Sequence, residues 1–306
     1  MNTAAPTKLS LWQVWLLAAR PRTLPAAAAP VLVGCAVAAY EGVFRPLPAL
    51  AAFLVGLLLQ IGANISNDYF DFKKGADTSE RVGPLRVTQA GLLTPRQVIG
   101  GMVVVFGAAA LIGIYLIWVA GLPALVLGVV AILSALAYTG GPYPLAYHGW
   151  GEVFVLLFFG LAAVCGTYYV QAGMLSMAAV WSSLPVGLLA MAILTVNNLR
   201  DIATDRASGK HTLAVRLGER GAVLEYGVWV GLAYGVVLTG VILGVLPLAA
   251  LLSLLSLPLA VRLMKQVART RGRALNPLLA KTGQLELLFA SLYAAGLLFS
   301  RWWSGF

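Results

Sequence analysis

Two segments of the chain combine carboxylate, amide and basic side chains at a spacing that suits chemistry on a phosphate group. The first, NISNDYFDFKKGAD at 64–77, holds two Asn, three Asp and two Lys. The second, NNLRDIATDRASGKHTLAVRLG, occupies 197–218. Five of the eleven acidic residues of the chain are aspartates in these two segments: Asp68, Asp71, Asp77, Asp201 and Asp205.

Helical spacing relates the polar residues within each segment. The residues at this spacing are Asn64, Asp68 and Asp71 in the first segment, and Asn197, Asp201 and Asp205 in the second. Steps of three and four residues place side chains along one stripe of a helix. Each segment also follows a long apolar run. We therefore expect each run to continue as a helix beyond the membrane edge, with its carboxylates on one face.

Acidic residues followed by basic ones favour a metal–diphosphate site. Carboxylate and amide oxygens suit Mg²⁺, which a few carboxylates usually hold together with substrate phosphate oxygens. The basic residues that could contact the phosphates are Lys73, Lys74, Arg86, Arg200, Arg206, Lys210 and Arg216. For either segment alone, a solvated helix end is the simpler interpretation. The matched pair favours the metal site.

Other metal sites lack their characteristic patterns in this sequence. An EF-hand would need a D-x-[DN]-x-[DN]-G run with a Glu at its twelfth position, and the chain has none. The two histidines, His148 and His211, are far apart in sequence, which disfavours zinc. Cys35 and Cys165 both lie in apolar runs, and we interpret them as small packing residues.

Composition indicates the elements that must position these segments. The chain is 60% hydrophobic and 10% charged, whereas soluble domains carry about 25% charge. This predicts an all-α polytopic membrane protein, because lipid offers no partner for an open sheet edge. The net charge of +10 fits basic loops facing anionic lipid, and we expect no nucleic-acid partner.

Nine apolar runs are long enough to span a bilayer: 23–40, 48–66, 98–119, 122–139, 153–172, 178–197, 222–244, 248–264 and 284–300. With nine spans, nineteen of the 21 Lys and Arg residues fall on one side, and Arg45 and Arg301 fall on the other. The positive-inside rule then places the N-terminus and both acidic segments in the cytoplasm, and the C-terminus opposite. We expect one domain, 1–306, with an interfacial segment over 1–22.

The residues of both segments resemble a known family. NDYFD at 67–71 and NNLRDIATDRASGK at 197–210 are similar to the two Asp-rich motifs of the UbiA superfamily of intramembrane prenyltransferases. RPRTLPAA at 20–27 and ERVGPLRVTQAGLL at 80–93 resemble the menaquinone branch of that superfamily. Hydroxybenzoate enzymes carry a third acidic residue where Gly75 stands here, and Asp77 follows two positions later.

The resemblance implies a fold, a reaction and a location. The fold would be nine helices around a central cavity that opens to the cytoplasmic face and to lipid. The reaction would transfer a polyprenyl group from polyprenyl diphosphate to 1,4-dihydroxy-2-naphthoate, with loss of CO₂ and diphosphate, giving a demethylmenaquinone. The enzyme would be integral to the plasma membrane of a bacterium, and two Mg²⁺ ions would bridge the motifs and the diphosphate.

Site residues follow from the two motifs. The expected metal site comprises Asn64, Asn67, Asp68, Asp71, Asn197, Asp201 and Asp205. Asp68, Asp71, Asp201 and Asp205 are the expected catalytic carboxylates, and Lys73, Lys74, Arg86, Arg200, Lys210 and Arg216 the expected diphosphate ligands. Arg22 would pair with the acceptor carboxylate, and Tyr138, Tyr143 and Tyr147 would shield an allylic cation. Each basic or aromatic residue could instead be an ordinary interfacial group.

Two alternatives remain open at this point. One is a prenyltransferase of the same superfamily that uses another aromatic acceptor, such as 4-hydroxybenzoate. The other is a secondary transporter, which also has buried polar residues and broken helices. Transport sites lie near the membrane midplane. The acidic segments here lie at span ends, and Glu286 is the possible exception as a charge at the membrane centre.

Overall fold

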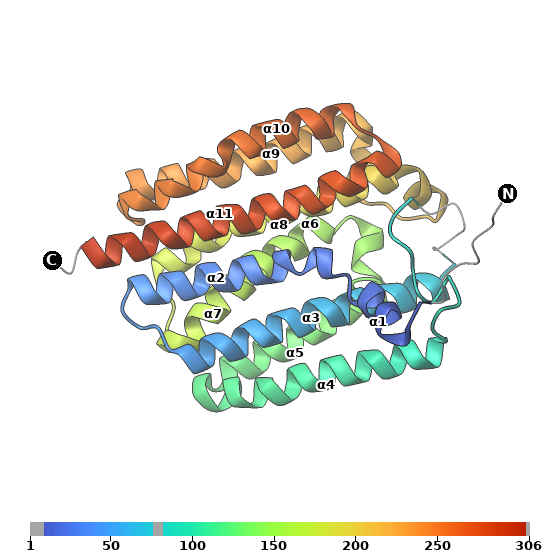
Figure 1. Ribbon diagram of the computed structural model, residues 1–306, viewed down its shortest axis with the longest axis horizontal. Coiled ribbons are helices and arrows are strands. Elements are labelled where there is room, and N and C mark those ends of the chain that lie inside the picture. The colour runs from blue at the N-terminus through green and yellow to red at the C-terminus, as the bar shows by residue number, and fades with distance from the viewer. Residues whose placement is uncertain (1–8, 76–81, 304–306) are drawn as a thin grey trace.

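The computed structural model describes residues 9–75 and 82–303, which form a bundle of helices running along one long axis (Figure 1). No strand occurs within these two ranges, so the all-α fold class is confirmed. Asp77 and the start of the ERVGPLRVTQAGLL stretch lie outside the described residues.

The elements follow one another in a simple order. They are α1 (Leu11–Ala19), η1 (Pro21–Thr23), α2 (Pro25–Tyr40), α3 (Pro46–Lys73), α4 (Pro95–Ala120), α5 (Leu122–Ala137), η2 (Leu145–His148), α6 (Gly151–Val155), η3 (Leu156–Ala162), α7 (Ala163–Ala172), α8 (Met177–Ala207), α9 (Leu213–Ile242), η4 (Leu248–Ser256), α10 (Leu257–Arg269), η5 (Gly272–Leu275) and α11 (Asn276–Trp303). Each apolar run predicted from the sequence is helical over most of its length.

Seven helices of the described chain are long and apolar enough to cross a membrane. An eighth is added if Leu11–Thr23 and Pro25–Tyr40, bent by 52°, form one span, and α5 is a shorter apolar helix. The protein is therefore an integral membrane protein, and the count of nine spans stays a prediction. The described N-terminal and C-terminal helices, α1 and α11, end at opposite ends of the bundle (Figure 1).

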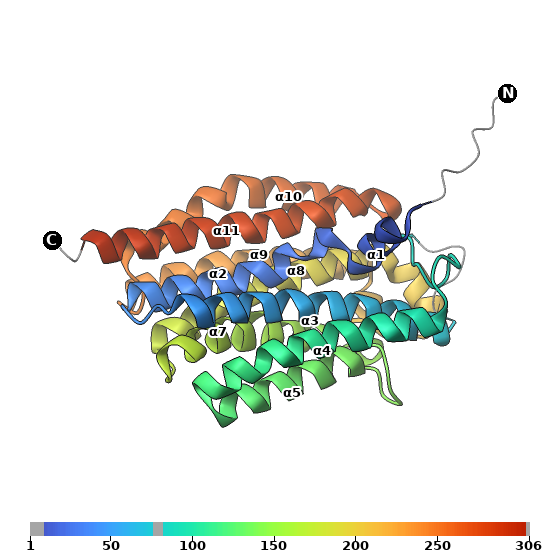
Figure 2. The ribbon, with the colours of Figure 1, turned by 60° about the horizontal axis from the view of Figure 1, so that its bottom comes forward.

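Both Asp-rich segments are helical continuations of spans. α3 runs on to Lys73 and α8 to Ala207, so neither helix ends where its apolar run ends. This confirms the expected continuation of both spans. The two extensions emerge at the end of the bundle that carries α1 (Figures 1 and 2).

The helices divide into central and peripheral ones. The apolar window of α8 is 67% buried within the protein and that of α11 is 56% buried, whereas that of α4 is 17% buried. α4 and α5 lie together at one edge of the bundle, and α10 lies at the opposite edge (Figures 1 and 2). The second Asp-rich segment therefore extends from the most buried of the seven long apolar helices.

The span of α6, η3 and α7 contains a π-helical segment, η3. Its backbone approaches α8 closely, because a Cβ on Gly160 would lie 3.0 Å from the Cα of Gly187. π-Helical turns shift the register of a helix and are frequent at functional sites. Here the segment carries Phe158 and Phe159 into the wall of the cavity described next.

Candidate active site

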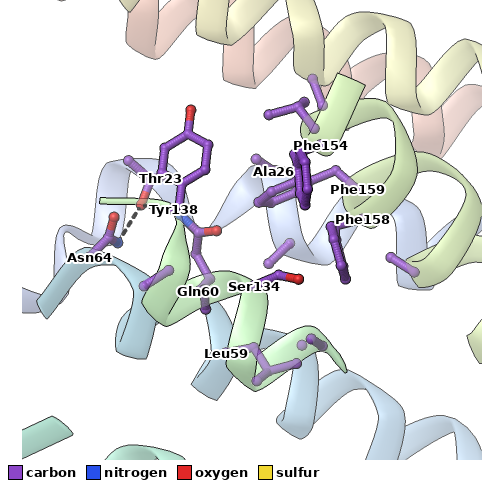
Figure 3. Close-up of a pocket in the computed structure, with 18 of the residues that line it drawn as sticks. Thr23, Ala26, Leu59, Gln60, Asn64, Ser134, Tyr138, Phe154, Phe158 and Phe159 are labelled. Atoms are coloured by element: carbon purple, nitrogen blue, oxygen red, sulfur yellow. Dashed lines mark hydrogen bonds between the residues drawn. The ribbon is translucent and has the colours of Figure 1, made fainter. Parts of the chain in front are cut away.

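A cavity of about 960 Å³ lies among α2, α3, α4, α5, α7 and α8. Its body is lined mainly by apolar side chains, including Phe154, Phe158 and Phe159. Figure 3 shows these three rings on one side of the cavity, with Tyr138 and Asn64 on the other. The polar part of the lining includes residues of both Asp-rich segments.

Asp71 is the most connected carboxylate of the first segment. It lies near the end of α3 and is buried. Its Oδ2 accepts a hydrogen bond from Arg86 Nη2 at 2.9 Å. Its Oδ1 lies 3.3 Å from Lys210 Nζ and 3.2 Å from the Tyr147 hydroxyl. Residues from three separate parts of the chain thus converge on this side chain.

Basic side chains contact the carboxylates of the second segment. Arg200 Nε donates to Asp201 Oδ1 at 2.8 Å, and its other nitrogens donate to Asn197 and Asn276. Lys210 Nζ lies 3.9 Å from Asp205 Oδ1. Since the same ammonium also contacts Asp71, Lys210 joins the two Asp-rich segments into one site.

Three predicted residues of the first segment have different surroundings. Asn67 Oδ1 accepts a hydrogen bond from the Thr139 hydroxyl at 2.8 Å, and Asn67 lines the cavity. Asn64 also lines the cavity, but its Nδ2 donates to the Ala19 carbonyl and the Thr23 hydroxyl at the α1–α2 junction.

Asp68 does not belong to the described cavity lining. Its two carboxylate oxygens accept hydrogen bonds from the backbone N–H groups of Val87 and Thr88, at 3.0 and 3.1 Å. The side chain therefore fastens the loop after α3 to the helix. This position differs from that of Asp71, although the two residues are close in sequence.

Five of the six predicted phosphate ligands separate into two groups. Arg86, Arg200 and Lys210 line the cavity. Lys73 and Arg216 are exposed and do not contribute to the described cavity lining, and Arg216 donates to the His148 carbonyl at 2.8 Å.

Lys74 lies beside the polar end of the cavity. Its Nζ donates to the Thr139 carbonyl at 2.7 Å and lies 4.8 Å from the centre of the Tyr147 ring. Burial lowers the pKa of Lys74, and the nearby Asp71 carboxylate partly offsets this shift.

The three tyrosines predicted to shield a cation also differ in position. Tyr138 lines the cavity. Tyr147 contacts Asp71 through its hydroxyl, and Lys210 lies 4.8 Å from its ring centre. Tyr143 is exposed and stacks on His148, with ring centroids 3.6 Å apart. Arg22 lines the cavity, as does Arg20.

Sequence reasoning missed several cavity residues. Glu152 is buried, lines the cavity and accepts a hydrogen bond on Oε1 from Asn198 Nδ2 at 3.1 Å. Phe154, Phe158 and Phe159 form the aromatic wall. The place of Asn198 within the second segment was the one indication in the sequence, and neither Glu152 nor the phenylalanines belong to a motif.

The donors at the polar end suit a hard cation bound together with a substrate. Oxygen-bearing side chains from both segments line the cavity: Asn67, Asp71, Asn197, Asp201 and Asp205. Among the described residues, no three His, Cys, Asp or Glu side chains form a group that could hold a metal ion. Mg²⁺ usually takes only one or two protein carboxylates and completes its shell with phosphate oxygens and waters. The residues therefore fit Mg²⁺ bound with a phosphate ligand.

Known proteins resemble this chain over almost its full length. The chain is 38% identical to the 1,4-dihydroxy-2-naphthoate octaprenyltransferase of Escherichia coli (strain K12), over 96% of this chain and 98% of that protein. It is 39% identical to the enzyme of the same name from Mycobacterium tuberculosis, over 94% of this chain and 97% of that protein.

Solved structures share the fold. A UbiA homologue from Aeropyrum pernix K1 matches with a TM-score of 0.66 and 17% identity, over 95% of this chain and 98% of that chain. A UbiA homologue from Archaeoglobus fulgidus, bound to GPP and Mg²⁺, matches with a TM-score of 0.65 and 14% identity, over 94% of this chain and 99% of that one. The profile of the UbiA prenyltransferase family matches residues 27–292. The chain therefore belongs to the UbiA prenyltransferase family.

Proposed function

We propose that the protein transfers a polyprenyl group from polyprenyl diphosphate to 1,4-dihydroxy-2-naphthoate. CO₂ and diphosphate leave, and the product is a demethylmenaquinone. One observation carries the reaction class: a largely apolar cavity ends where two Asp-rich segments and three buried or half-buried cations, Arg86, Arg200 and Lys210, meet. The relatives named 1,4-dihydroxy-2-naphthoate octaprenyltransferase support the acceptor.

The cavity suits both parts of a prenyl diphosphate. Moving an apolar tail from lipid into water costs about 0.8 kcal/mol per CH₂, so the tail must stay in an apolar environment. The body of the cavity offers that environment, and its polar end offers charged hydrogen-bond donors. The apolar tail of the donor therefore matches the body of the cavity, and its diphosphate matches the polar end.

Residues of both segments would hold Mg²⁺. Asn67 and Asp71 on α3, with Asp201 and Asp205 on α8, are the proposed ligands, and Asn197 lies beside them. Bound Mg²⁺ would stabilise the negative charge that develops on the leaving diphosphate. The solved relative with GPP and Mg²⁺ supports magnesium as the metal. Two ions are part of this proposal.

The side chains have separate tasks in the transfer. Arg86, Arg200 and Lys210 orient the diphosphate, which receives the electron pair as the donor C–O bond breaks. Tyr138 and the phenylalanine wall exclude water from the allylic carbon. The ring carbon that bears the carboxylate forms the new C–C bond, and departing CO₂ returns its electron pair to the ring.

The peripheral candidates have lesser tasks in this proposal. We assign Asp68 and Asn64 to holding the loop and the α1–α2 junction in place. Lys74 and Tyr147 support Asp71 and Lys210. Arg22 remains the proposed partner of the acceptor carboxylate.

The location is proposed from the distribution of charge. We place the protein in a bacterial plasma membrane, as one domain over 1–306, with the α1 end of the bundle facing the cytoplasm. The excess of Lys and Arg on the predicted cytoplasmic side supports this orientation. Prenyl transfer explains the family and the relatives, and a transporter does not.

Prenyl transfer by the purified protein in nanodiscs tests the function. The reaction contains a polyprenyl diphosphate, Mg²⁺ and either 1,4-dihydroxy-2-naphthoate or 4-hydroxybenzoate, and mass spectrometry follows product and CO₂ loss. We expect a decarboxylated naphthoate product that disappears with EDTA and returns with excess Mg²⁺. Product from hydroxybenzoate alone would overturn the acceptor, and folded protein without product from either would overturn the reaction.

A further inference from the structure

We propose that Glu152 is a catalytic base for the acceptor, taking the proton of the hydroxyl next to the acceptor carboxylate and returning it after CO₂ leaves. This inference rests on the proposed function, and it concerns a residue outside both Asp-rich segments. The geometry of Glu152, its neighbours and the charge pattern of the cavity carry it.

Glu152 is a carboxylate held in place with an oxygen available. It lines the cavity and is 4% exposed. Asn198 is the one side chain among the described residues that donates a hydrogen bond to it, and that bond reaches Oε1. Burying a carboxylate in an apolar wall is costly, so such a group inside a membrane protein usually has a function.

The position of Glu152 is next to the proposed reacting carbon. Asn198, which orients Glu152, precedes Asp201 by three residues and therefore lies about one helical turn from it on α8. The hydroxyl of Tyr138, which also lines the cavity, lies beside Gly151, the residue before Glu152, because a Cβ on Gly151 would be 3.1 Å from it. An acceptor touching Glu152 would therefore lie beside the carbon that carries the diphosphate.

Charge orients the acceptor between these groups. Arg22, the proposed partner of the acceptor carboxylate, lines the same cavity as Glu152 and would attract that carboxylate. The negative charge of Glu152 repels that carboxylate and attracts a hydroxyl proton. The charges of two residues of α9 also act on Glu152. Arg216 attracts its carboxylate, and Glu225 repels it.

The surrounding wall suits a flat bicyclic ring. Phe154 follows Glu152 by two residues, and its ring stacks on that of Phe158 with centroids 5.9 Å apart. Phe158 and Phe159 both line the cavity, and both belong to the π-helical segment η3. Figure 3 shows these rings facing Tyr138 across the cavity.

The reaction needs a base that takes up the hydroxyl proton of the acceptor and later gives it back. Attack by the ring carbon that bears the carboxylate turns the neighbouring hydroxyl into a ketone once its proton moves to Glu152. The product of this step is a β-keto acid, which loses CO₂ and leaves an enolate. Glu152 then returns the proton to the same oxygen, restoring the hydroxyl and the aromatic ring. The proton is conserved, and the donor electron pair departs with diphosphate.

The test is a thermodynamic cycle in which the Glu152 carboxylate is removed from the protein and the hydroxyl is removed from the ligand, separately and together. Inhibition constants are measured in nanodiscs for 1-hydroxy-2-naphthoate and for 2-naphthoate, using the unaltered protein and Glu152→Gln. We expect the hydroxyl to strengthen binding about tenfold or more in the unaltered protein, as a hydrogen bond to a charged group does. In Glu152→Gln the two constants should be nearly equal. Turnover of 1,4-dihydroxy-2-naphthoate should fall about 100-fold or more, the usual contribution of general-base catalysis.

Glu286→Gln is the matched control. Glu286 is also a buried carboxylate, but it lies on α11, does not belong to the described cavity lining and is not among the charged groups that act on Glu152. Glu286→Gln should keep both the ratio of the two inhibition constants and the turnover. Binding of an unreactive prenyl thiolodiphosphate, measured for every variant, should also stay unchanged and shows that the donor site is folded.

The possible outcomes distinguish the role of Glu152 from the proposed function of the protein. An unchanged hydroxyl ratio or normal turnover in Glu152→Gln would overturn the role of Glu152 and leave the proposed function standing. A second measurement needs no variant: 1-methoxy-2-naphthoate should bind the unaltered protein as weakly as 2-naphthoate, and binding as tight as that of the hydroxyl compound would overturn the role. Failure of the unaltered protein to prenylate 1,4-dihydroxy-2-naphthoate would overturn the function itself.

Discussion

The difference between Asp71 and Asp68 leads to a prediction that sequence alone does not make. Both are buried aspartates of α3, three residues apart. Asp71 lines the cavity and contacts the cationic groups of Arg86 and Lys210. Asp68 instead accepts hydrogen bonds from two backbone N–H groups. We expect Asp71→Asn to lose the reaction and Asp68→Asn to lose stability.

The structure sets the size of each effect. Asp71→Asn removes a charge from a site that stabilises a developing anion, where one such group is worth about 10²–10³ in kcat. It should also weaken the response to Mg²⁺ about 10- to 100-fold, the loss seen when even the partners of a metal ligand are changed. Asp68→Asn leaves one backbone N–H without its acceptor, which costs about 1–3 kcal/mol of folding free energy.

Turnover per folded molecule, measured against Mg²⁺ concentration in nanodiscs, separates the two variants. Thermal unfolding of the same samples gives the stability of each. We expect Asp68→Asn to unfold at a lower temperature with an unchanged half-saturating Mg²⁺ concentration. Equal shifts of that concentration in both variants, or normal turnover of Asp71→Asn, would refute the assignment of the two aspartates.

Three further changes test other parts of the structure. Lys210→Met should raise KM for the polyprenyl diphosphate about tenfold or more while leaving KM for the acceptor near its original value, because a charge-assisted contact to phosphate is lost. Arg200→Gln should lower turnover about 100-fold by releasing Asp201, whereas the exposed Arg216→Gln should stay within a few-fold; similar losses in both would contradict the division of the basic residues. Gly187→Ala should lower the melting temperature, because the new Cβ would lie 2.9 Å from the Cα of Gly160. Such overpacking costs about 1–3 kcal/mol of folding free energy. In the same assay Gly100→Ala on α4 should be neutral or stabilising, because its Cβ would meet open space.

Sequence patterns predicted the helices that position the site. The long apolar runs and the polar residues that follow at helical spacing predicted that α3 and α8 would continue beyond their apolar runs, and both do. The matched pair of Asp-rich segments and the family resemblance predicted one shared site, and the contacts of Lys210 with Asp71 and Asp205 join the segments. The helical continuations depend on local periodicity, which a sequence displays directly.

The direction in which each carboxylate points was beyond this reasoning. Residues advance by about 100° around a helix, so Asp68 lies about 60° from Asp71 and at the edge of the predicted stripe. Whether an edge position faces the cavity or a loop depends on what packs there. In this protein the loop of Val87 and Thr88 packs against Asp68. That contact joins residues about twenty positions apart, and no spacing rule predicts it.

Basic and aromatic residues illustrate the same limit. Lys73 and Lys74 are neighbours, yet only Lys74 reaches the Thr139 carbonyl and the Tyr147 ring among the described contacts. Glu152 carries no motif, and its place in the cavity depends on Asn198 of a different helix. Tertiary packing selects among residues that are equivalent in sequence, so a sequence yields a set of candidates and the fold chooses among them.

The charges of the cavity bear on how many metal ions accompany the donor. Five basic side chains of the lining, Arg20, Arg22, Arg86, Arg200 and Lys210, face four acidic ones, Asp71, Glu152, Asp201 and Asp205. With all nine groups ionised, the described lining therefore supplies one net positive charge, which cannot balance a diphosphate and an acceptor carboxylate in a site of low dielectric. Divalent cations must enter with the donor, and one ion would still leave the filled site negative. This imbalance supports the proposal of two Mg²⁺ ions, and it explains why carboxylates are kept beside a substrate that is itself an anion.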